Sequence, residues 1–511
     1  MKYAAALLAL LSAAFGQDAI APPPTLTAAD VQSVVQSAAS SVNSSTMVIA
    51  VTDRMGNILA VFSEPNAPAT AAANFSAMVA TPEVAIALAR TASFFSNSAA
   101  PLSSRTVRFI STTHFPAGVM YTSNAPLYGI ENTNRGCTLN VTFPTGQVPV
   151  PPATLSDGIT PGLGPLTGKA DLNDSDQSAV NPGGVPLFKG GVLVGGVGVT
   201  GVPANVAEFA ALSGAVGAGF GGAPAPPGVV FINGIALPFV NQTTQPDGTS
   251  PAPIDVTDPS TGAFILPLAN PAANTCPNAA PACPIDSPGP APEGDLIPVQ
   301  AGPLGGLSQS DVQGIVDAAV AAAQQTRAVI RLPIGTRAEM AIAVSDLDGT
   351  LLALHRMPDA TVFSIDVASA KSRNVIYFTG ALPPLRAGTA VTNRTIGFGA
   401  QPFYPPGIDG TSPGPFFDLY TNDVANPCTQ GAQPPNPNQN GIVFFPGSLP
   451  LYRNGVLVGG LGVSGDGVDQ DDYVTAQGAI GFPAPASIRA DQVILRGVRL
   501  PYQTFPRNPT N

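Results

Sequence analysis

The sequence predicts an α+β protein made of two similar domains, and two observations carry this prediction. First, four blocks of sequence occur twice in the same order, which indicates a tandem duplication. Second, helical patterns alternate with paired strand patterns in each copy, and hairpins imply an antiparallel sheet flanked by helices. Length alone would suggest about three domains for 511 residues, so the repeat reduces that number to two.

The repeated blocks can be read directly from the printed sequence. Residues 26–35, 47–56, 189–201 and 230–239 return at 307–316, 340–349, 453–465 and 493–502. Four blocks in one order exclude coincidence. We therefore expect one domain at residues 25–240, called copy one below, and a second at residues 303–505, called copy two.

Each copy is expected to begin with an amphipathic helix and a pair of strands. Thr27 and Ser308 are suited to cap the helices, and apolar side chains follow at helical spacing. These side chains are Val31, Val34, Val35 and Ala38 in copy one and Val312, Ile315, Val316 and Ala319 in copy two. Strands are predicted at 47–51 and 340–344, and the Asp348-Gly349 turn that follows the second of them is typical of a hairpin.

The later elements of each copy follow the same order. A second helix is predicted at about residues 82–95 and 364–378, and a glycine-rich hairpin at 186–199 and 450–463. Each copy then closes with a short helix and a strand that ends in Leu-Pro.

Three segments lack any sustained period. Residues 98–183 and 380–446 are rich in Pro, Gly, Asn and Thr, and we expect them to be long, largely irregular insertions. Residues 241–302 are predicted to be a Pro-rich, semi-extended linker between the domains.

The composition excludes several classes of function. Charged residues make up 10% of the chain and the formal net charge is −11, so a nucleic-acid binder that neutralises phosphates is not expected. The chain has 2 histidines and no tryptophan, which leaves little material for catalysis that needs several histidines. An apolar share of 44% excludes a wholly disordered chain.

Residues 1–16 have the pattern of a secretory signal peptide. Lys2 precedes an apolar run from Ala4 to Ala14, and Ala14-Phe15-Gly16 fits the rule for cleavage after small residues. A membrane anchor would need about 20 apolar residues, so no membrane span is expected. The mature chain is predicted to begin near Gln17 and to be secreted or periplasmic.

Four cysteines in an exported protein predict two disulfides. Cys276 and Cys283 are seven residues apart and suit a local loop closure, whereas Cys137 and Cys428 would pair across the chain or remain free. The alternative, a structural zinc site, is disfavoured because the Cys-x6-Cys spacing lacks a nearby histidine.

Two motifs resemble ligand-binding motifs, but the sequence around them does not support that function. Residues 196–201 and 460–465 both spell G-x-G-x-x-G, but no βαβ unit surrounds them, as a dinucleotide site requires. Glycines within a strand more often allow a close approach of other groups. The acidic residues between Asp466 and Asp472 lack the order of an EF-hand, and we expect them at a helix start, where they suit the helix dipole.

The order of the blocks in both copies resembles the GlcG/HbpS-type haem-binding family, which includes the C-terminal domain of PduO-type corrinoid enzymes. The resemblance lies in the helix start Leu307 to Asp311, the hairpin Val344 to Leu351, the Ser364 to Lys371 helix and the Pro446 to Gly465 segment. Copy one matches at fewer positions, which are Asp53, Gly56, Arg90, Pro182 to Pro186 and Gly195 to Gly201. About half of each copy is covered, and the late glycine segment is the most specific part.

The resemblance implies a PAS/profilin-like fold in both copies and a haem or related tetrapyrrole as ligand. In this family, the strand glycines would let a flat ligand or a partner chain approach the sheet. His355 and His114 are the strong nitrogen ligands for haem iron in this chain, although no motif match assigns either one. Because family members often oligomerise, we expect an internal pseudo-dimer or a homo-oligomer.

The expected function is therefore an exported haem- or tetrapyrrole-binding protein without catalytic activity. The alternative is an exported scaffold that binds a protein partner or a small organic ligand and has lost haem binding. The scarcity of histidine favours this alternative. No acid, base or nucleophile is positioned for an enzymatic reaction, and no G-x-S-x-G motif is present.

Overall fold

The computed structural model describes residues 22–72, 78–130, 182–222, 228–269, 276, 280–425, 430 and 438–510. The predicted signal peptide lies outside these residues, as do Cys137, Cys428 and most of the first insertion. No helix in the described ranges is long and apolar enough to cross a membrane.

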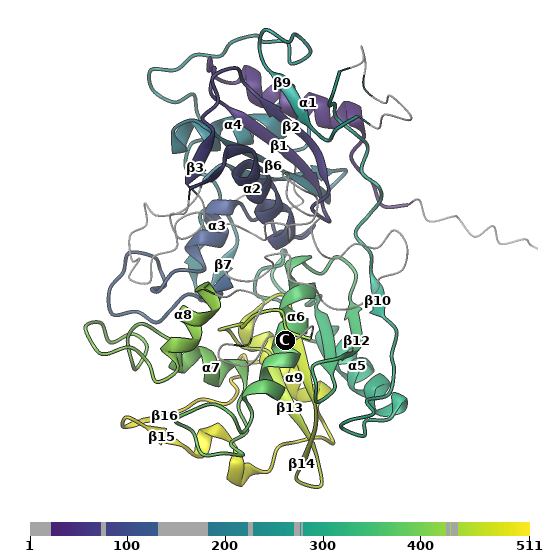
Figure 1. Cartoon of the computed structure of the whole chain (residues 1–511), viewed down its shortest axis with the longest axis vertical. Coiled ribbons are helices and arrows are strands. Elements are labelled where there is room, and N and C mark those ends of the chain that lie inside the picture. The colour runs from purple at the N-terminus through teal and green to yellow at the C-terminus, as the bar shows by residue number, and fades with distance from the viewer. Residues whose placement is uncertain are drawn as a thin grey trace, which may run out of the picture.

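Each copy contains a five-stranded antiparallel sheet, and the two sheets have the same strand order. Figure 1 shows copy one in the upper part of the view and copy two in the lower part. The copy-one order is β5 (Gly184–Lys189), β6 (Val192–Thr200), β1 (Val48–Asp53), β2 (Ile58–Ser63) and β9 (Ala263–Leu266). The copy-two order is β13 (Ser448–Arg453), β14 (Val456–Ser464), β11 (Ala341–Ser345), β12 (Leu351–Arg356) and β10 (Gly294–Ile297). The predicted α+β class with antiparallel sheets is confirmed.

Helices cover both faces of each sheet. In copy one, α1 (Ala28–Ser40) and α4 (Ala204–Gly217) pack on one face, and α2 (Thr81–Phe95) packs on the other. In copy two, α5 (Gln309–Ala323) and α9 (Val468–Gly478) take the first face, and α6 (Phe363–Phe378) takes the second. The predicted caps Thr27 and Ser308 each form a capping box with an aspartate.

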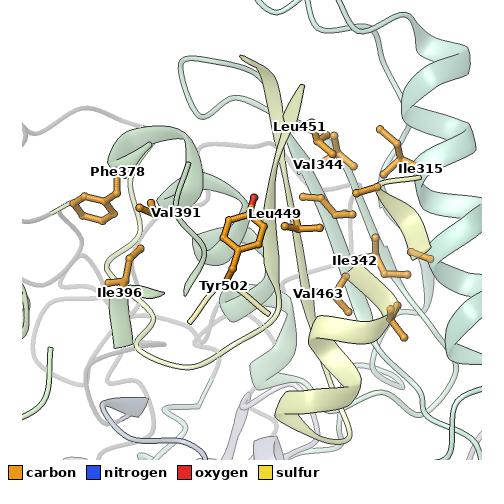
Figure 2. Packing of buried hydrophobic residues seen from close by; sticks show 14 of the residues in the cluster. Ile315, Ile342, Val344, Phe378, Val391, Ile396, Leu449, Leu451, Val463 and Tyr502 are labelled. Atoms are coloured by element: carbon orange, nitrogen blue, oxygen red, sulfur yellow. The ribbon is translucent and has the colours of Figure 1, made fainter. Parts of the chain in front are cut away.

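Alternating side chains along the central strands fill these two layers. Ile342 and Val344 of β11 pack with Ile315 of α5 and with Val463 of β14 (Figure 2). Ala341 and Ala343 point to the opposite face, into a cluster that contains residues from both copies. The hydrophobic core is therefore continuous across the boundary between the copies.

The strand glycines have a structural role. A Cβ atom at Gly198 would collide with the carbonyl oxygen of Ala85 in α2, and one at Gly462 would collide with the carbonyl oxygen of Ala368 in α6. The place expected for a flat ligand or a partner chain is thus occupied by the backbone of a helix.

Residues 241–302, which were predicted to be a linker, also contribute one strand to each sheet. Their short apolar runs supply β9, which pairs with β2, and β10, which pairs with β12. An open sheet edge offers unpaired backbone groups to any nearby extended segment, and the high proline content concealed these two strands. The predicted disulfide between Cys276 and Cys283 is present.

The predicted final strand of each copy is instead a tight hairpin. It is formed by β7 (Phe231–Ile232) with β8 (Ile235–Ala236), and by β15 (Ile494–Leu495) with β16 (Val498–Arg499). Asn233-Gly234 and Arg496-Gly497 take positive φ at both turn positions, which allows a two-residue turn. The short strands β3 (Thr70–Ala72) and β4 (Met78–Ala80) form another hairpin.

The insertions contain ordered helices in both copies. Helix α3 (Ser104–Phe109) corresponds to α7 (Asn393–Gly399), and both begin with a capping box. The described part of copy two also contains α8 (Phe417–Ala425) and, near its end, the 3-10 turns Ala486–Ile488 and Ala490–Gln492. The remainder of the described insertions is irregular, as expected.

Candidate ligand-binding site between the two copies

A pocket of about 690 Å³ lies between the two copies. Its volume falls within the range of pockets that hold small molecules or cofactors, about 300–1,000 Å³. Copy one contributes the end of α2, residues 122–127 and the β7–β8 hairpin, while copy two contributes the start of α6, residues 444–446 and the start of α9. Because both copies form its wall, neither copy alone contains the complete pocket.

Most of the pocket wall is apolar and rich in aromatic rings. The aromatic members are Phe95, Phe115, Phe363, Phe398, Phe444 and Phe445, and the aliphatic ones include Leu102, Ile110, Leu127, Ile232, Val329 and Ile330. The Phe95 and Phe363 rings are stacked across the boundary between the copies. Such a wall suits a flat, largely apolar ligand.

One end of the pocket is polar and charged. Asp471 and Arg394 line it. Lys371 lies behind this wall and donates hydrogen bonds to Asp471 Oδ2 at 2.9 Å and to the Val463 carbonyl oxygen at 2.8 Å. Arg394 is paired with Asp469 and Asp472.

Burial shifts the pKa values of Asp471 and Lys371 at this polar end of the pocket. Lys371 is fully buried and Asp471 is 2% exposed. Loss of solvation raises the pKa of Asp471 to about 7, against the opposing effect of the Lys371 ammonium. The same loss of solvation lowers the pKa of Lys371.

A second group of charges joins the copies beside the pocket. Asp359 of copy two pairs with Arg54 of copy one at 2.8 Å and with Arg331 of its own copy at 2.8 Å. It also accepts hydrogen bonds from the backbone N–H and the hydroxyl of Ser98. Arg331 is further paired with the buried Asp466.

The acidic stretch from Asp466 to Asp472 thus serves in ion pairs. Asp469 and Asp471 lie in the first turn of α9, where the helix dipole favours them, as expected. Asp466 precedes the helix and binds Arg331. Among the described residues, no group of three or more His, Cys, Asp or Glu side chains is arranged to hold a metal ion.

His114 is buried beside the pocket. Its Nε2 lies 2.8 Å from Asp409 Oδ1 of copy two, and its Nδ1 has no hydrogen-bond partner. It borders a small cavity whose wall shares Thr122, Asn124 and Pro406 with the large pocket. A ring nitrogen oriented by a carboxylate, with the other nitrogen unpartnered, is the usual arrangement of a metal-binding histidine.

His355 is remote from the pocket between the copies. It lies on β12 and lines a separate cavity of about 350 Å³ against α5. Its Nδ1 is 2.7 Å from Asp295 Oδ1 of β10. The two predicted histidines are therefore not brought together.

Sequence reasoning missed most of the pocket residues. Phe95 and Phe363 follow the pattern of ordinary core residues, and Asp409 lies in an insertion without any periodic signal. Lys371 is the exception, because it ends the Ser364 to Lys371 segment through which the sequence resembles the family.

Comparisons with known proteins match part of the chain. Residues 307–480 match the family model described as "Haem degrading protein HbpS-like". The corrinoid adenosyltransferase PduO of Salmonella typhimurium is 28% identical over 165 residues, which cover 32% of this chain and 35% of that protein. PduO of Citrobacter freundii is 28% identical over 151 residues, 29% of this chain and 33% of that protein. The chain thus spans about a third of the length of these relatives.

Two solved structures also match about a third of the chain. A complex of PduOC with haem has a TM-score of 0.24 and 23% identity, and covers 34% of this chain and 94% of that one. A double mutant of Streptomyces reticuli HbpS has a TM-score of 0.21 and 20% identity, and covers 34% of this chain and 83% of that one. Residues 307–480 of this chain are thus similar in sequence to the HbpS-like family.

Proposed function

We propose that the protein binds haem or a related tetrapyrrole in the pocket between the two copies, without turning it over. The observation that carries this proposal is the pocket itself, which has a volume of about 690 Å³ and a wall rich in phenylalanine. The match of residues 307–480 to the HbpS-like family model supports a tetrapyrrole as the ligand. Burial of such a ligand in an aromatic, water-poor site would supply most of the binding free energy.

The residues present fit a haem group in part. The six phenylalanines would hold the ring, and haem would supply an iron centre that accepts an axial ligand. Of the two histidines His114 is the better candidate, because it lies beside the pocket with its Nδ1 unpartnered and its Nε2 oriented by Asp409, although it is not part of the pocket wall. His355 is a weaker candidate, because the cavity that it lines is polar and separate.

A second candidate function is supported by a specific observation. Neither histidine lines the large pocket, so the site also suits a flat organic ligand that carries no iron. This is the exported scaffold that binds a small molecule without haem.

The proposal has two further parts: the protein is exported, and it has no catalytic activity. The charged groups around the pocket are held in ion pairs, which favours binding over proton transfer. The Cys276–Cys283 disulfide suits an oxidising compartment. If the chain is exported through its leader, N-terminal sequencing of protein recovered outside the cytoplasm should begin near Gln17.

Hemin titration tests the central part of this proposal. We expect a saturable shift of the Soret band with one haem per chain, which His114→Ala alters and His355→Ala leaves unchanged. Incubation with ascorbate should leave the Soret band intact, whereas its decay would indicate turnover. No saturable shift in the wild type would exclude haem binding and leave the iron-free ligand as the alternative.

A further inference from the structure

Only one of the two carboxylate oxygens of Asp471 has a hydrogen-bond partner within the protein. Its Oδ2 binds Lys371, while its Oδ1 is buried and has no hydrogen-bond partner. Asp471 also belongs to the wall of the pocket between the copies. A buried oxygen without a partner destabilises the folded state, because its lost hydration is not replaced by a hydrogen bond. Such a group at a pocket wall is suited to a ligand that supplies the missing donor.

Copy one shows that the fold does not need this ion pair. A Cβ atom at Gly447 would meet Lys371 and Asp471, and one at the equivalent Gly183 would meet Leu88 and Ala207. Leu88 and Ala207 therefore occupy the positions of Lys371 and Asp471. The same packing is achieved with apolar side chains, so the charged pair in copy two is an addition to the fold.

The charges at this end of the pocket disfavour an anionic ligand group. The cations are Lys371 and Arg394, and the carboxylates are Asp469, Asp471 and Asp472, which gives an excess of one negative charge. Both cations are already engaged. Lys371 binds Asp471 and a carbonyl oxygen, and its ammonium lies 4.9 Å from the centre of the Phe445 ring. In the ionised form of Asp471 that pairs with Lys371, the unpartnered Oδ1 is thus an acceptor.

We infer that the polar end of the pocket selects a ligand that donates an N–H group to Asp471 Oδ1. This inference rests on the proposed function, and it specifies which kind of tetrapyrrole the pocket prefers. The preferred tetrapyrrole is one that keeps its pyrrole N–H groups, as a metal-free or open-chain molecule does. In haem these nitrogens are deprotonated and bind iron, so they have no proton to donate.

A matched pair of ligands tests this inference. Metal-free protoporphyrin IX and hemin share the ring and its propionates but differ at the central nitrogens. Their affinities for the whole protein can be measured by ligand absorbance and, for protoporphyrin, by fluorescence. We expect Asp471→Asn to weaken protoporphyrin binding about tenfold or more, because a charged hydrogen bond is lost, and to change hemin binding by less than about threefold.

A second variant guards against misfolding. Asp471→Asn leaves Lys371 buried without its partner, which is destabilising. The double variant Lys371→Leu/Asp471→Ala instead reproduces the Leu88 and Ala207 pair of copy one, so it is expected to fold. It should also weaken protoporphyrin binding at least tenfold while retaining hemin affinity, which reports an intact pocket.

The outcomes separate this inference from the proposed function. If the wild type binds neither ligand, the proposed function fails and the inference fails with it. If both ligands bind but the double variant weakens them equally or not at all, only the role of Asp471 is overturned. A selective loss of protoporphyrin binding supports the inference.

Discussion

The ring of Phe95 in copy one is stacked on the ring of Phe363 in copy two, with 4.2 Å between the ring centres and 13° between the planes. Phe95 is the last residue of α2 and Phe363 is the first residue of α6. Both rings line the pocket between the copies. The same contact therefore joins the copies and forms part of the ligand site.

This stack predicts coupled effects on stability and binding. Phe363→Ala should lower the free energy of unfolding by about 3–5 kcal/mol, and a double-mutant cycle with Phe95→Ala should give a coupling of about 1 kcal/mol. Urea unfolding measures both quantities. Phe264→Ala is the matched control, since Phe264 packs on Phe62 within copy one and should leave hemin affinity unchanged. Additive effects of the two pocket variants would contradict the role given to the stack.

Asp359 is predicted to hold the two copies together as one cooperative unit. Asp359→Asn leaves Arg54 and Arg331 without this carboxylate, so the free energy of unfolding should fall by about 3 kcal/mol. Calorimetry should then show two separate transitions in place of one. Asp295→Asn is the control, because the exposed Asp295–His355 pair should contribute less than about 1 kcal/mol. An unchanged single transition in Asp359→Asn would show that apolar contacts alone couple the copies.

The raised pKa of Glu339 predicts that the stability of the folded protein depends on pH. Burial raises its pKa to about 7, assisted by the nearby carboxylates Asp466 and Asp359 and opposed by Arg331. Because the folded-state pKa lies above the ordinary value, this group's contribution is fully present below about pH 4.5 and is lost as the pH rises through about 7. Glu339→Gln should therefore stabilise the protein at pH 8 by about 1 kcal/mol, after allowance for solvent screening.

Thermal unfolding of wild type and Glu339→Gln across pH 5 to 8 measures this effect. The difference in melting temperature should grow as the pH rises. An equal difference at every pH would show that the side chain acts through packing and not through its charge.

The strand glycines predict a purely structural phenotype. Gly462→Ala would place a methyl group against the carbonyl oxygen of Ala368, so α6 must move away from the sheet and stability should fall by about 1–3 kcal/mol. Gly314→Ala is the control, because a Cβ at this position in α5 meets no other atom and should stabilise the helix by about 0.5–1 kcal/mol. Unfolding in urea distinguishes the two, and equal stability of both variants would contradict the packing role.

Much of the fold could be predicted from local patterns. The capping residues Thr27 and Ser308, the apolar stripes of α1 and α5 and the paired strands all depend on neighbours in the sequence. The edge strands β9 and β10 could not be predicted, because a four-residue strand in a proline-rich segment is defined by the sheet edge beside it. The Asn233-Gly234 turn was a readable hairpin signal within the predicted final strand.

Much less of the candidate site could be predicted from the sequence. Its two walls come from different copies, so residues such as Leu127 and Phe445 meet only through the packing of the domains. The predicted His114 lies beside the pocket and is oriented by Asp409, a residue 295 positions away in the sequence. His355 was a candidate because of its residue type and its place near the end of a predicted strand, and the structure places it away from the pocket between the copies.

The most direct measurement is the hemin affinity of two tryptophan variants. Leu127 lines the pocket between the copies, whereas Met120 is 59% exposed on the same segment and lies outside the pocket. Leu127→Trp fills the pocket with an added ring, so its dissociation constant for hemin should rise at least tenfold, while Met120→Trp should bind hemin as the wild type does. Equal, tight binding of hemin by both variants would place the ligand outside this pocket and contradict the account.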